Sequence, residues 1–387
     1  MNYDEITLEQ AQKSKGIKWT RYDPDVIPSW IADMDYPVAE PISNLLQSIA
    51  HVGDLSYAPN MYEEQLVELF SERMQVRYGW TPDPSGFDCM TDIVQAIYIA
   101  VAALCKEDEQ VIVQTPTYHP ILSACQKMKR EMVFSPFVPS GNEWQIDFDQ
   151  LRRCISPRTK LFLLVNPHNP SGKVLQKEEL ESIANIVLEN DLIVVSDEIH
   201  CDLRYSNAGP HIPFASISKE IGKRTVTFNS ATKSHNLGGI RSAITHYGSE
   251  SLRARFDRFP EGMRGGSNAI GNRATRIAWE MCDDWLEYTI TYLESNRNYF
   301  FDYLKQNMPD LRHIQNQATF LAWIDCRDVF TDQDPADFFL EKARVATYSG
   351  VKFGLGGEGC IRMNFATSRP ILSEKLRRMK TALNEIH

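Results

Sequence analysis

The stretch DLIVVSDE at positions 191–198 sets an apolar run between acidic ends. A run of this length is typical of a fully buried strand. Three similar runs occur in the chain: EQVIVQTP (109–116), KLFLLVNP (160–167) and RTVTFNSA (224–231). Helix-like stretches alternate with these runs, among them residues 61–79 and 92–105. The alternation predicts an α/β fold with a mostly parallel central sheet whose two faces are covered by helices.

The four apolar runs share a second feature, which is that each ends in polar or conformationally special residues. These are Thr115-Pro116, Asn166-Pro167, Asp197-Glu198 and Ser230. In open α/β sheets, ligands bind outside the carboxyl ends of the parallel strands. The four ends therefore predict a single pocket at one edge of the sheet.

The pattern changes after about residue 268. A largely helical stretch at 268–308 is followed by strand-like residues 313–326 and 359–366 around a helix at 335–346. This order predicts a smaller α+β domain. The N-terminal residues, with four prolines before position 42, indicate an irregular arm and a short helix. We expect three parts: an arm that belongs partly to the small domain (1–48), a large domain (49–290) and the small domain (291–387).

Composition excludes several classes of protein. The chain has 387 residues and a formal net charge of -10, which argues against nucleic-acid binding because that requires a basic face. No apolar run approaches the roughly 20 residues of a membrane span, and no signal peptide is visible. The eight cysteines form no CxxC pair and the nine histidines have no metal-ligand spacing. We therefore expect a cytoplasmic protein without a metal.

Two motifs carry candidate binding groups. NPHNPSG (166–172) is a rigid turn in which Asn169 is able to donate to a ligand hydroxyl, although a purely structural turn explains the pattern equally. Asp197 ends a hydrophobic run, where a carboxylate costs free energy unless it is paired. A protonated ring nitrogen of a ligand, a helix N-terminus or an arginine would each be a suitable partner.

The segment SATKSHNLGGIRS (230–242) combines hydroxyl groups, one amine and one guanidinium. Arginine suits a phosphate because its planar fork matches the phosphate oxygens, and the glycines at 238 and 239 allow close approach of the backbone. An exposed loop with ordinary charges is the alternative interpretation.

Taken together and in this order, the motifs resemble the pyridoxal-5′-phosphate enzymes of the aspartate aminotransferase fold, known as fold type I. The likeness covers nearly the whole chain and is strongest to the branch of cystathionine β-lyases and C–S lyases. The motifs that carry it are Lys18-Trp19, WIADMD (30–35), NPHNPSG, SDEIH (196–200), the SATK segment and RMNFA (362–366).

The resemblance implies a role for individual residues. Lys233 corresponds to the lysine that binds the cofactor covalently and acts as general base, Asp197 to the carboxylate that keeps the pyridine nitrogen protonated, and Tyr118 to the ring that stacks on the cofactor. The remaining residues implied in cofactor binding are Asn169, His200, Ser230, Arg241, the backbone of Ile93 and Val94, and Tyr57 from a neighbouring subunit. Arg362, Asn169 and Ala32 correspond to groups that bind the substrate.

This resemblance implies a homodimer with shared active sites that acts on a small amino acid. The branch favours β-elimination from cystathionine or another cysteine S-conjugate, which yields a thiol, pyruvate and ammonia. An aminotransferase or a specialised biosynthetic enzyme needs the same residues, so both stay open. A purely regulatory protein is disfavoured because the lysine, the aspartate and the arginine are all present.

Three positions depart from the expected pattern or imitate another one. Asp92 stands where the family usually has a small residue or glycine, and we expect it to act as an N-cap that points away from the phosphate, which it would repel. His235 stands where the branch usually has an aromatic residue, and we expect a packed, hydrogen-bonded side chain. GLGGEG (354–359) matches a dinucleotide-binding motif in letters only, because the residues after it are strand-like.

Overall fold

A computed structural model describes residues 2–57, 65–266 and 268–386. Its largest sheet has eight strands in the order β2-β9-β8-β7-β6-β3-β4-β5. The strands are β2 (Phe87–Met90), β3 (Gln110–Thr115), β4 (Glu131–Ser140), β5 (Glu143–Ile146), β6 (Thr159–Val165), β7 (Ile193–Asp197), β8 (Thr225–Asn229) and β9 (Ala243–Tyr247). Strands β4, β3, β6, β7 and β8 are parallel neighbours. The four predicted strands are thereby confirmed as β3, β6, β7 and β8, and so is the mostly parallel sheet.

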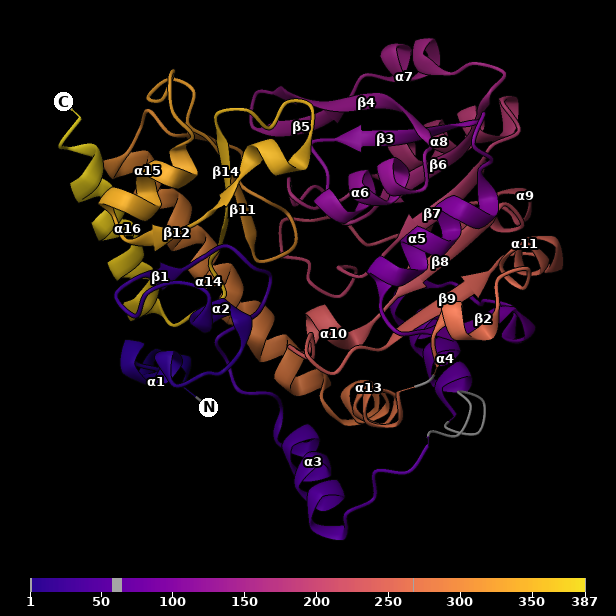
Figure 1. The fold of residues 1–387 in the computed structure, drawn as a ribbon, viewed down its shortest axis with the longest axis horizontal. Coiled ribbons are helices and arrows are strands. Elements are labelled where there is room, and N and C mark those ends of the chain that lie inside the picture. Colours follow the sequence, from indigo (N-terminus) through magenta and orange to yellow (C-terminus); the bar gives the residue numbers. More distant parts are fainter. Residues whose placement is uncertain (1, 58–64, 267, 387) are drawn as a thin grey trace.

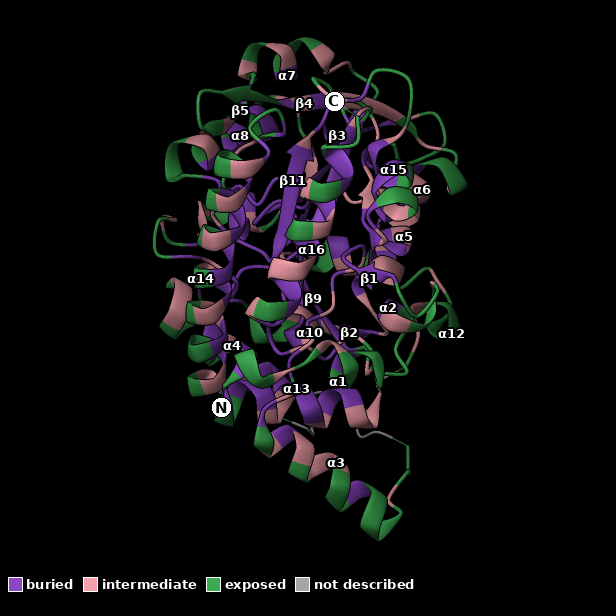
Figure 2. Ribbon diagram, turned by 90° about the vertical axis from the view of Figure 1, so that its left-hand side faces the viewer, coloured by how far each residue is buried: buried purple, intermediate pink, exposed green. Residues whose placement is uncertain are grey.

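Helices cover both faces of this sheet (Figure 1), which explains why its central strands are apolar at successive positions. In β3, Val111 and Val113 belong to one apolar cluster, whereas Ile112 belongs to the other. The first face carries α5 (Ile93–Leu104), α6 (His119–Lys127) and α11 (Glu250–Phe256). The second face carries α7 (Phe148–Cys154), α8 (Lys177–Glu189) and α9 (Lys219–Gly222). Figure 2 shows the strands buried between them.

The described part of the chain that forms the large sheet contains five further helical elements. They are the 3-10 helices η2 (Pro84–Gly86) and η3 (Phe214–Ser216), and the helices α4 (Leu66–Tyr78), α10 (Ala231–Ser234) and α12 (Glu261–Arg264). The helix predicted at 61–79 is α4, and the part of that range before residue 65 lies outside the described residues.

The C-terminal part forms a second layered unit. Its elements are α14 (Asp283–Asn307), β10 (Arg312–His313), β11 (Leu321–Asp325), α15 (Pro335–Lys342), β12 (Val345–Ala346), β13 (Tyr348–Ser349), η4 (Gly350–Phe353), β14 (Cys360–Asn364) and α16 (Arg369–Leu383). Helix α13 (Ala269–Met281) precedes this unit and packs against α4, where Trp279 contacts Phe70. A four-stranded sheet has the order β10-β11-β14-β13. Helix α14 runs unbroken through position 290, so the expected domain boundary stays a prediction.

Two predicted elements of this unit are wrong in extent. The strand expected at 313–326 is interrupted between β10 and β11, because the backbone N–H groups of Gln317 and Ala318 donate to the carbonyl of Gly172 instead of to a sheet. The helix expected at 335–346 ends at Lys342. Arg344 adopts a left-handed backbone with φ 52°, and the chain then enters β12.

The N-terminal segment packs on the C-terminal unit. It contains η1 (Tyr3–Glu5), α1 (Leu8–Gln12), α2 (Ile17–Thr20), β1 (Ile27–Pro28) and α3 (Glu40–Val52). Strand β1 pairs in parallel with β12, and the Tyr3 hydroxyl lies 2.8 Å from the Thr289 hydroxyl on α14. Helix α3 projects away from the rest of the molecule in both views (Figures 1 and 2).

A buried charge pair joins α4 to the segment that follows β7. Arg73 contacts the carboxylate of Asp202 at 3.0 Å, and the Tyr78 hydroxyl donates to the same carboxylate at 2.5 Å. Burial alone would raise the pKa of Asp202, but Arg73 and Arg77 hold that pKa well below its usual range. The ionised pair therefore helps to hold the strand end that carries Asp197.

Replacing Asp202 by Asn is expected to lower the free energy of unfolding by about 3 kcal/mol, because it removes the buried one of the two carboxylates that pair with Arg73 and leaves only the half-exposed Asp283. Urea unfolding followed by tryptophan fluorescence measures this loss. Asp149→Asn is the matched control, since Asp149 forms an exposed pair with Arg152 and its loss should cost less than about 1 kcal/mol. Equal losses in the two variants would contradict the structural role of Asp202.

Candidate active site

The carboxyl ends of β3, β6, β7 and β8 meet at one edge of the sheet because these strands are adjacent and parallel. The backbone N–H of Asn166 donates to the carbonyl of Asp197 at 3.0 Å across the neighbouring ends. The convergence that the sequence predicted at this edge is confirmed.

Asp197 is a buried carboxylate at the end of β7. It accepts one hydrogen bond, from the backbone N–H of Ile199 at 3.2 Å, and within the described ranges it has no ion-pair partner. Burial raises its pKa to about 7, against the opposing effect of Lys233. Neither an arginine nor the start of a helix satisfies this group, so it is suited to a cationic N–H of a bound molecule.

Lys233 lies in α10, whose N-cap is Ser230. Its amine donates to the carbonyl of Ala32 at 2.9 Å. Burial is the largest influence on Lys233 and lowers the pKa of its amine, with a further decrease from Arg362. An amine of this kind gives up its proton more readily than a surface lysine, as a nucleophile or a general base requires.

Arg362 is a buried guanidinium on β14, where its side chain faces the large sheet. It donates to the side-chain oxygen of Asn169 at 3.1 Å and to the carbonyl of Trp30 at 2.9 Å. Its Nε has no hydrogen-bond partner, and no carboxylate of the described residues pairs with it. Burial lowers its pKa to about 10. The group is therefore suited to binding a carboxylate bidentately.

Two aromatic rings enclose this arginine, and the sequence analysis did not include them. The guanidinium carbon lies 5.3 Å from the ring centre of Tyr348 and 5.0 Å from that of Phe353. The Tyr348 hydroxyl in turn lies 3.4 Å from Nε2 of His119. These residues come from β13, η4 and α6, so no local motif could have grouped them with position 362.

Tyr118 and His200 complete the central part of the site. Tyr118 precedes α6, and burial raises its pKa to about 12 despite the opposing effect of Arg362. His200 is buried, which lowers its pKa to about 3, and its Nδ1 has no partner in the described chain. At neutral pH the imidazole is uncharged and has a free polar atom.

One loop near the N-terminus touches both functional cations. The carbonyl of Trp30 accepts from Arg362, and that of Ala32 accepts from Lys233. The Asn364 side chain donates to the carbonyls of Ile31 at 2.7 Å and of Asp33 at 2.6 Å. The WIADMD motif therefore contacts the two cations through its backbone carbonyls. Ala32, which we predict to bind the substrate, lies beside Lys233.

The N-terminus of α5 forms the other end of the site. Asp92 caps this helix by accepting from the backbone N–H of Gln95 at 2.8 Å, so the predicted N-cap is confirmed. Its second oxygen lies 2.8 Å from Nη1 of Arg241. The N–H groups of Ile93 and Val94 are the first of the helix and have no intrahelical acceptor, which suits anion binding. Helix α5 and Arg241 thus meet at one point.

Two further expectations have definite outcomes. His235 is fully buried, its Nδ1 lies 2.9 Å from the Ser234 hydroxyl, and its ring stacks on Trp285 with centres 6.0 Å apart. It is thus confirmed as a packed, hydrogen-bonded side chain.

GLGGEG leads into β14 rather than into a helix, which confirms that it is a loop. Tyr57 is fully exposed, and the described chain brings none of the other site residues to it.

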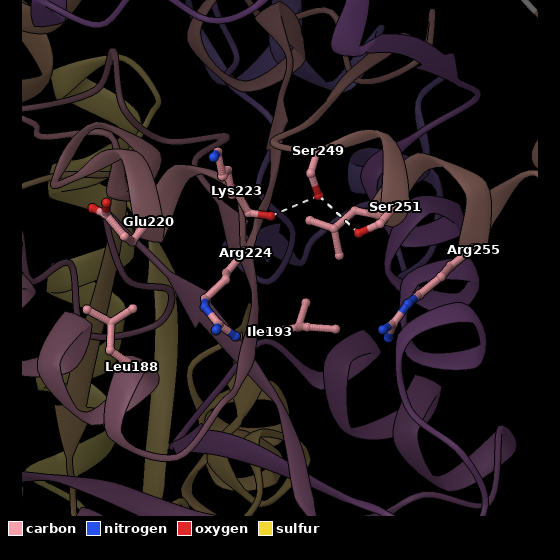
Figure 3. A pocket seen from close by; sticks show the side chains of 9 residues that line it. Leu188, Ile193, Glu220, Lys223, Arg224, Ser249, Ser251 and Arg255 are labelled. Carbon is pink, nitrogen blue, oxygen red and sulfur yellow. Dashed lines mark hydrogen bonds between the residues drawn. The ribbon is translucent and has the colours of Figure 1, made fainter.

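A separate cavity of about 450 Å³ lies at the opposite edge of the sheet, beside Ile193 at the start of β7 and Arg224 just before β8. Figure 3 shows Ser249 there, donating to the carbonyl of Lys223 at 2.9 Å. The candidate active site at the carboxyl ends does not include this cavity.

Comparison with known proteins identifies the family. A model of the aminotransferase class I and II family matches residues 40–378. The chain belongs to this family. It is 32% identical to cystathionine β-lyase PatB of Bacillus subtilis (strain 168), over 99% of this chain and 100% of that protein. The structure of a PLP-bound C–S lyase from Staphylococcus hominis is 31% identical, with a TM-score of 0.93 over 100% of this chain and 99% of that one. The structure of a protein named OvoB is 35% identical, with a TM-score of 0.91 over 96% of both chains.

The described residues fit pyridoxal 5′-phosphate. Asp197 offers a buried carboxylate without a counter-cation, which suits the protonated ring nitrogen of the cofactor. Lys233 offers an amine with a lowered pKa for a covalent bond to the aldehyde. The start of α5 and the guanidinium of Arg241 suit the phosphate. In this aminotransferase fold, the three groups lie along the same edge of the sheet.

In the cofactor-free protein, Asp197→Asn is expected to raise the free energy of unfolding at pH 8. The folded-state pKa of Asp197, about 7, lies above the ordinary value of 3.8, so stability is lost as the pH rises through this interval. The gain approaches about 4 kcal/mol, because one pKa unit corresponds to about 1.4 kcal/mol. Urea unfolding of the two proteins at pH 5 and pH 8 measures it.

The gain should shrink at pH 5, where folded Asp197 is protonated. Adding pyridoxal 5′-phosphate should stabilise the wild type more than the variant. A variant that is less stable than the wild type at pH 8 would show that Asp197 has a cationic partner within the protein itself.

Proposed function

We propose that this family member is a pyridoxal-5′-phosphate-dependent C–S β-lyase, which cleaves cystathionine or related cysteine S-conjugates to a thiol, pyruvate and ammonia. The observation that carries the proposal is a pair of unmatched buried charges at one site: Asp197 lacks a cation and Arg362 lacks an anion among the described residues. The cofactor ring and an amino-acid carboxylate would satisfy these two groups. The choice of C–S cleavage is supported by the full-length likeness to proteins named as lyases.

The cofactor-binding residues divide by the part of the cofactor that they contact. Asp197, Tyr118, Asn169 and His200 hold the ring, and Asp197 keeps its nitrogen protonated. Ser230, Arg241, Ile93 and Val94 hold the phosphate. When bound, pyridoxal 5′-phosphate accepts the electron pair released at the Cα of the substrate.

The chain's own groups then account for binding and proton transfer. Arg362 binds the substrate carboxylate, assisted by Asn169, whose side-chain oxygen accepts from its Nη1 at 3.1 Å. Lys233 removes the Cα proton as general base, and burial favours this role because it lowers the pKa of the amine. The carbonyl of Ala32 orients that amine through the 2.9 Å hydrogen bond. Departure of the sulfur group from Cβ, with a proton taken up to give the thiol, completes the elimination, and water hydrolyses the released aminoacrylate to pyruvate and ammonia.

Incubating the holoenzyme with L-cystathionine in the absence of any keto acid is expected to give sustained release of pyruvate, ammonia and free thiol, detected by mass spectrometry. A single turnover that resumes only after a keto acid is added would instead establish an aminotransferase. Lys233→Ala should lower kcat by at least roughly 10³-fold, because it removes the general base. Borohydride reduction followed by peptide mapping should find the cofactor on Lys233.

The proposal extends to the setting of the enzyme. The described residues contain no disulfide, although all eight cysteines lie among them, which supports a reducing compartment and hence the cytoplasm. Within the described ranges, no helix is long and apolar enough to cross a bilayer.

A homodimer is supported by an exposed apolar segment after α3. The exposed fractions of Val52, Leu55 and Tyr57 are 74%, 75% and 102%. Such a run is typical of a surface that a partner covers. In the dimer, Tyr57 would reach the phosphate bound by the neighbouring subunit.

Sedimentation at micromolar concentration is expected to show a dimer. Tyr57→Phe should weaken pyridoxal 5′-phosphate binding about fivefold by removing one hydrogen bond to a charged group, while leaving the dimer intact. A monomeric protein, or a variant with unchanged cofactor affinity, would contradict the shared site.

A further inference from the structure

Asp92 introduces a negative charge at the point where this site has to hold an anion. The residue is fixed there rather than free to turn away, because its Oδ1 accepts from the backbone N–H of Gln95 at 2.8 Å. Its Oδ2 lies 2.8 Å from Nη1 of Arg241. The side chain of Asp92 has an exposed fraction of 26%, whereas that of Arg241 is 63% exposed. The acid is thus anchored by the helix backbone, and the arginine is the more exposed partner.

The negative charge of Asp92 also affects the ring-binding part of the site. Burial is the largest cause of the raised pKa of Tyr118, and the charge of Asp92 raises this pKa further. Arg264 in α12 is paired with Asp88 at 3.0 Å and with Asp257 at 2.9 Å. Among the described residues, Arg241 is the cation that pairs with Asp92, so it would be shared between Asp92 and the phosphate.

With these contacts, the carboxylate of Asp92 and a bound phosphate would compete for the guanidinium of Arg241. A phosphate at the start of α5 gains from the helix N–H groups and from Arg241. It is opposed by the fixed carboxylate of Asp92, which repels it and also competes for the same guanidinium. A glycine or another small residue at position 92 would leave the helix N–H groups and the whole of Arg241 to the phosphate.

We propose that Asp92 selectively weakens the binding of the cofactor phosphate, so that pyridoxal 5′-phosphate exchanges more readily from this enzyme than from the same site without the acid. The inference rests on the proposed function, because it takes the α5 end of the site to be the phosphate end. It assigns Asp92 a role in cofactor affinity and none in proton transfer.

The test is Asp92→Asn, which keeps the shape of the side chain and the cap acceptor but removes the charge. The dissociation constant and the release rate of pyridoxal 5′-phosphate are measured from visible absorbance after dilution and dialysis. We expect binding about tenfold tighter and release correspondingly slower, as expected for the loss of a like-charge contact in a partly exposed site. Affinity for pyridoxal, which lacks the phosphate, should be unchanged.

Asp147→Asn is the matched control on the protein. Asp147 caps α7 by accepting from the backbone N–H of Gln150 at 2.8 Å and lies 4.0 Å from Arg153, so the substitution makes the same change of charge and cap away from the site. Thermal unfolding of the cofactor-free proteins shows whether either substitution alters the fold. Equal affinity for the phosphorylated cofactor in wild type and control is expected.

Each outcome is decisive. Weaker or unchanged binding of pyridoxal 5′-phosphate by Asp92→Asn would overturn the inference and would leave Asp92 as a residue that merely positions Arg241. An equal gain for pyridoxal would overturn it as well, since the effect would then not act on the phosphate. Failure of the wild type to bind the cofactor on Lys233 would contradict the proposed function itself, and peptide mapping detects that result separately.

Discussion

The structure of the site depends on two buried ionisable groups that have no ion-pair partner among the described residues. Asp197 ends a central strand of the large sheet, and Arg362 lies on β14 of the C-terminal unit. A buried charge without a partner costs free energy, so a bound molecule that supplied the missing charges would be favoured. The two groups belong to different layers of the molecule, so in the proposed function the ligand would complete the electrostatics between the layers.

The N-terminal loop provides the structural link between these layers. Its carbonyls at Trp30 and Ala32 contact Arg362 and Lys233, and Asn364 holds the loop from the other side. At the end of the loop, Asp35 pairs with Lys18 at 2.9 Å, and both side chains are almost fully buried. A backbone fixed in this way sets the spacing between the amine of Lys233, the proposed general base, and the guanidinium of Arg362, the proposed substrate-binding group. Chemistry that depends on near-ångström placement benefits from such a rigid connection.

The α5 end of the site, which we propose to be the phosphate end, differs from the ring end in how its charged groups are paired. The ring end offers buried groups that lack partners, whereas the α5 end offers a cation that is already partnered by Asp92. In the proposed function, tight recognition would therefore be concentrated at the cofactor ring and at the substrate carboxylate. The start of α5 is a terminus that Asp92 caps, and its remaining N–H groups suit an anion.

The sequence by itself determined the sheet, its four central strands and the convergence of Asn166, Asp197 and Ser230 at one edge, because buried parallel strands appear as short continuous apolar runs and their carboxyl ends must meet. It also determined the class of chemistry through Lys233 and its neighbours. Only the tertiary structure brought Tyr348, Phe353 and His119 around Arg362, and only it paired Asp92 with Arg241. Those contacts join residues far apart in the chain, and their spacing obeys no local period. Likewise the break between β10 and β11 depends on hydrogen bonds to Gly172, about 140 residues earlier, which no pattern within 313–326 could reveal.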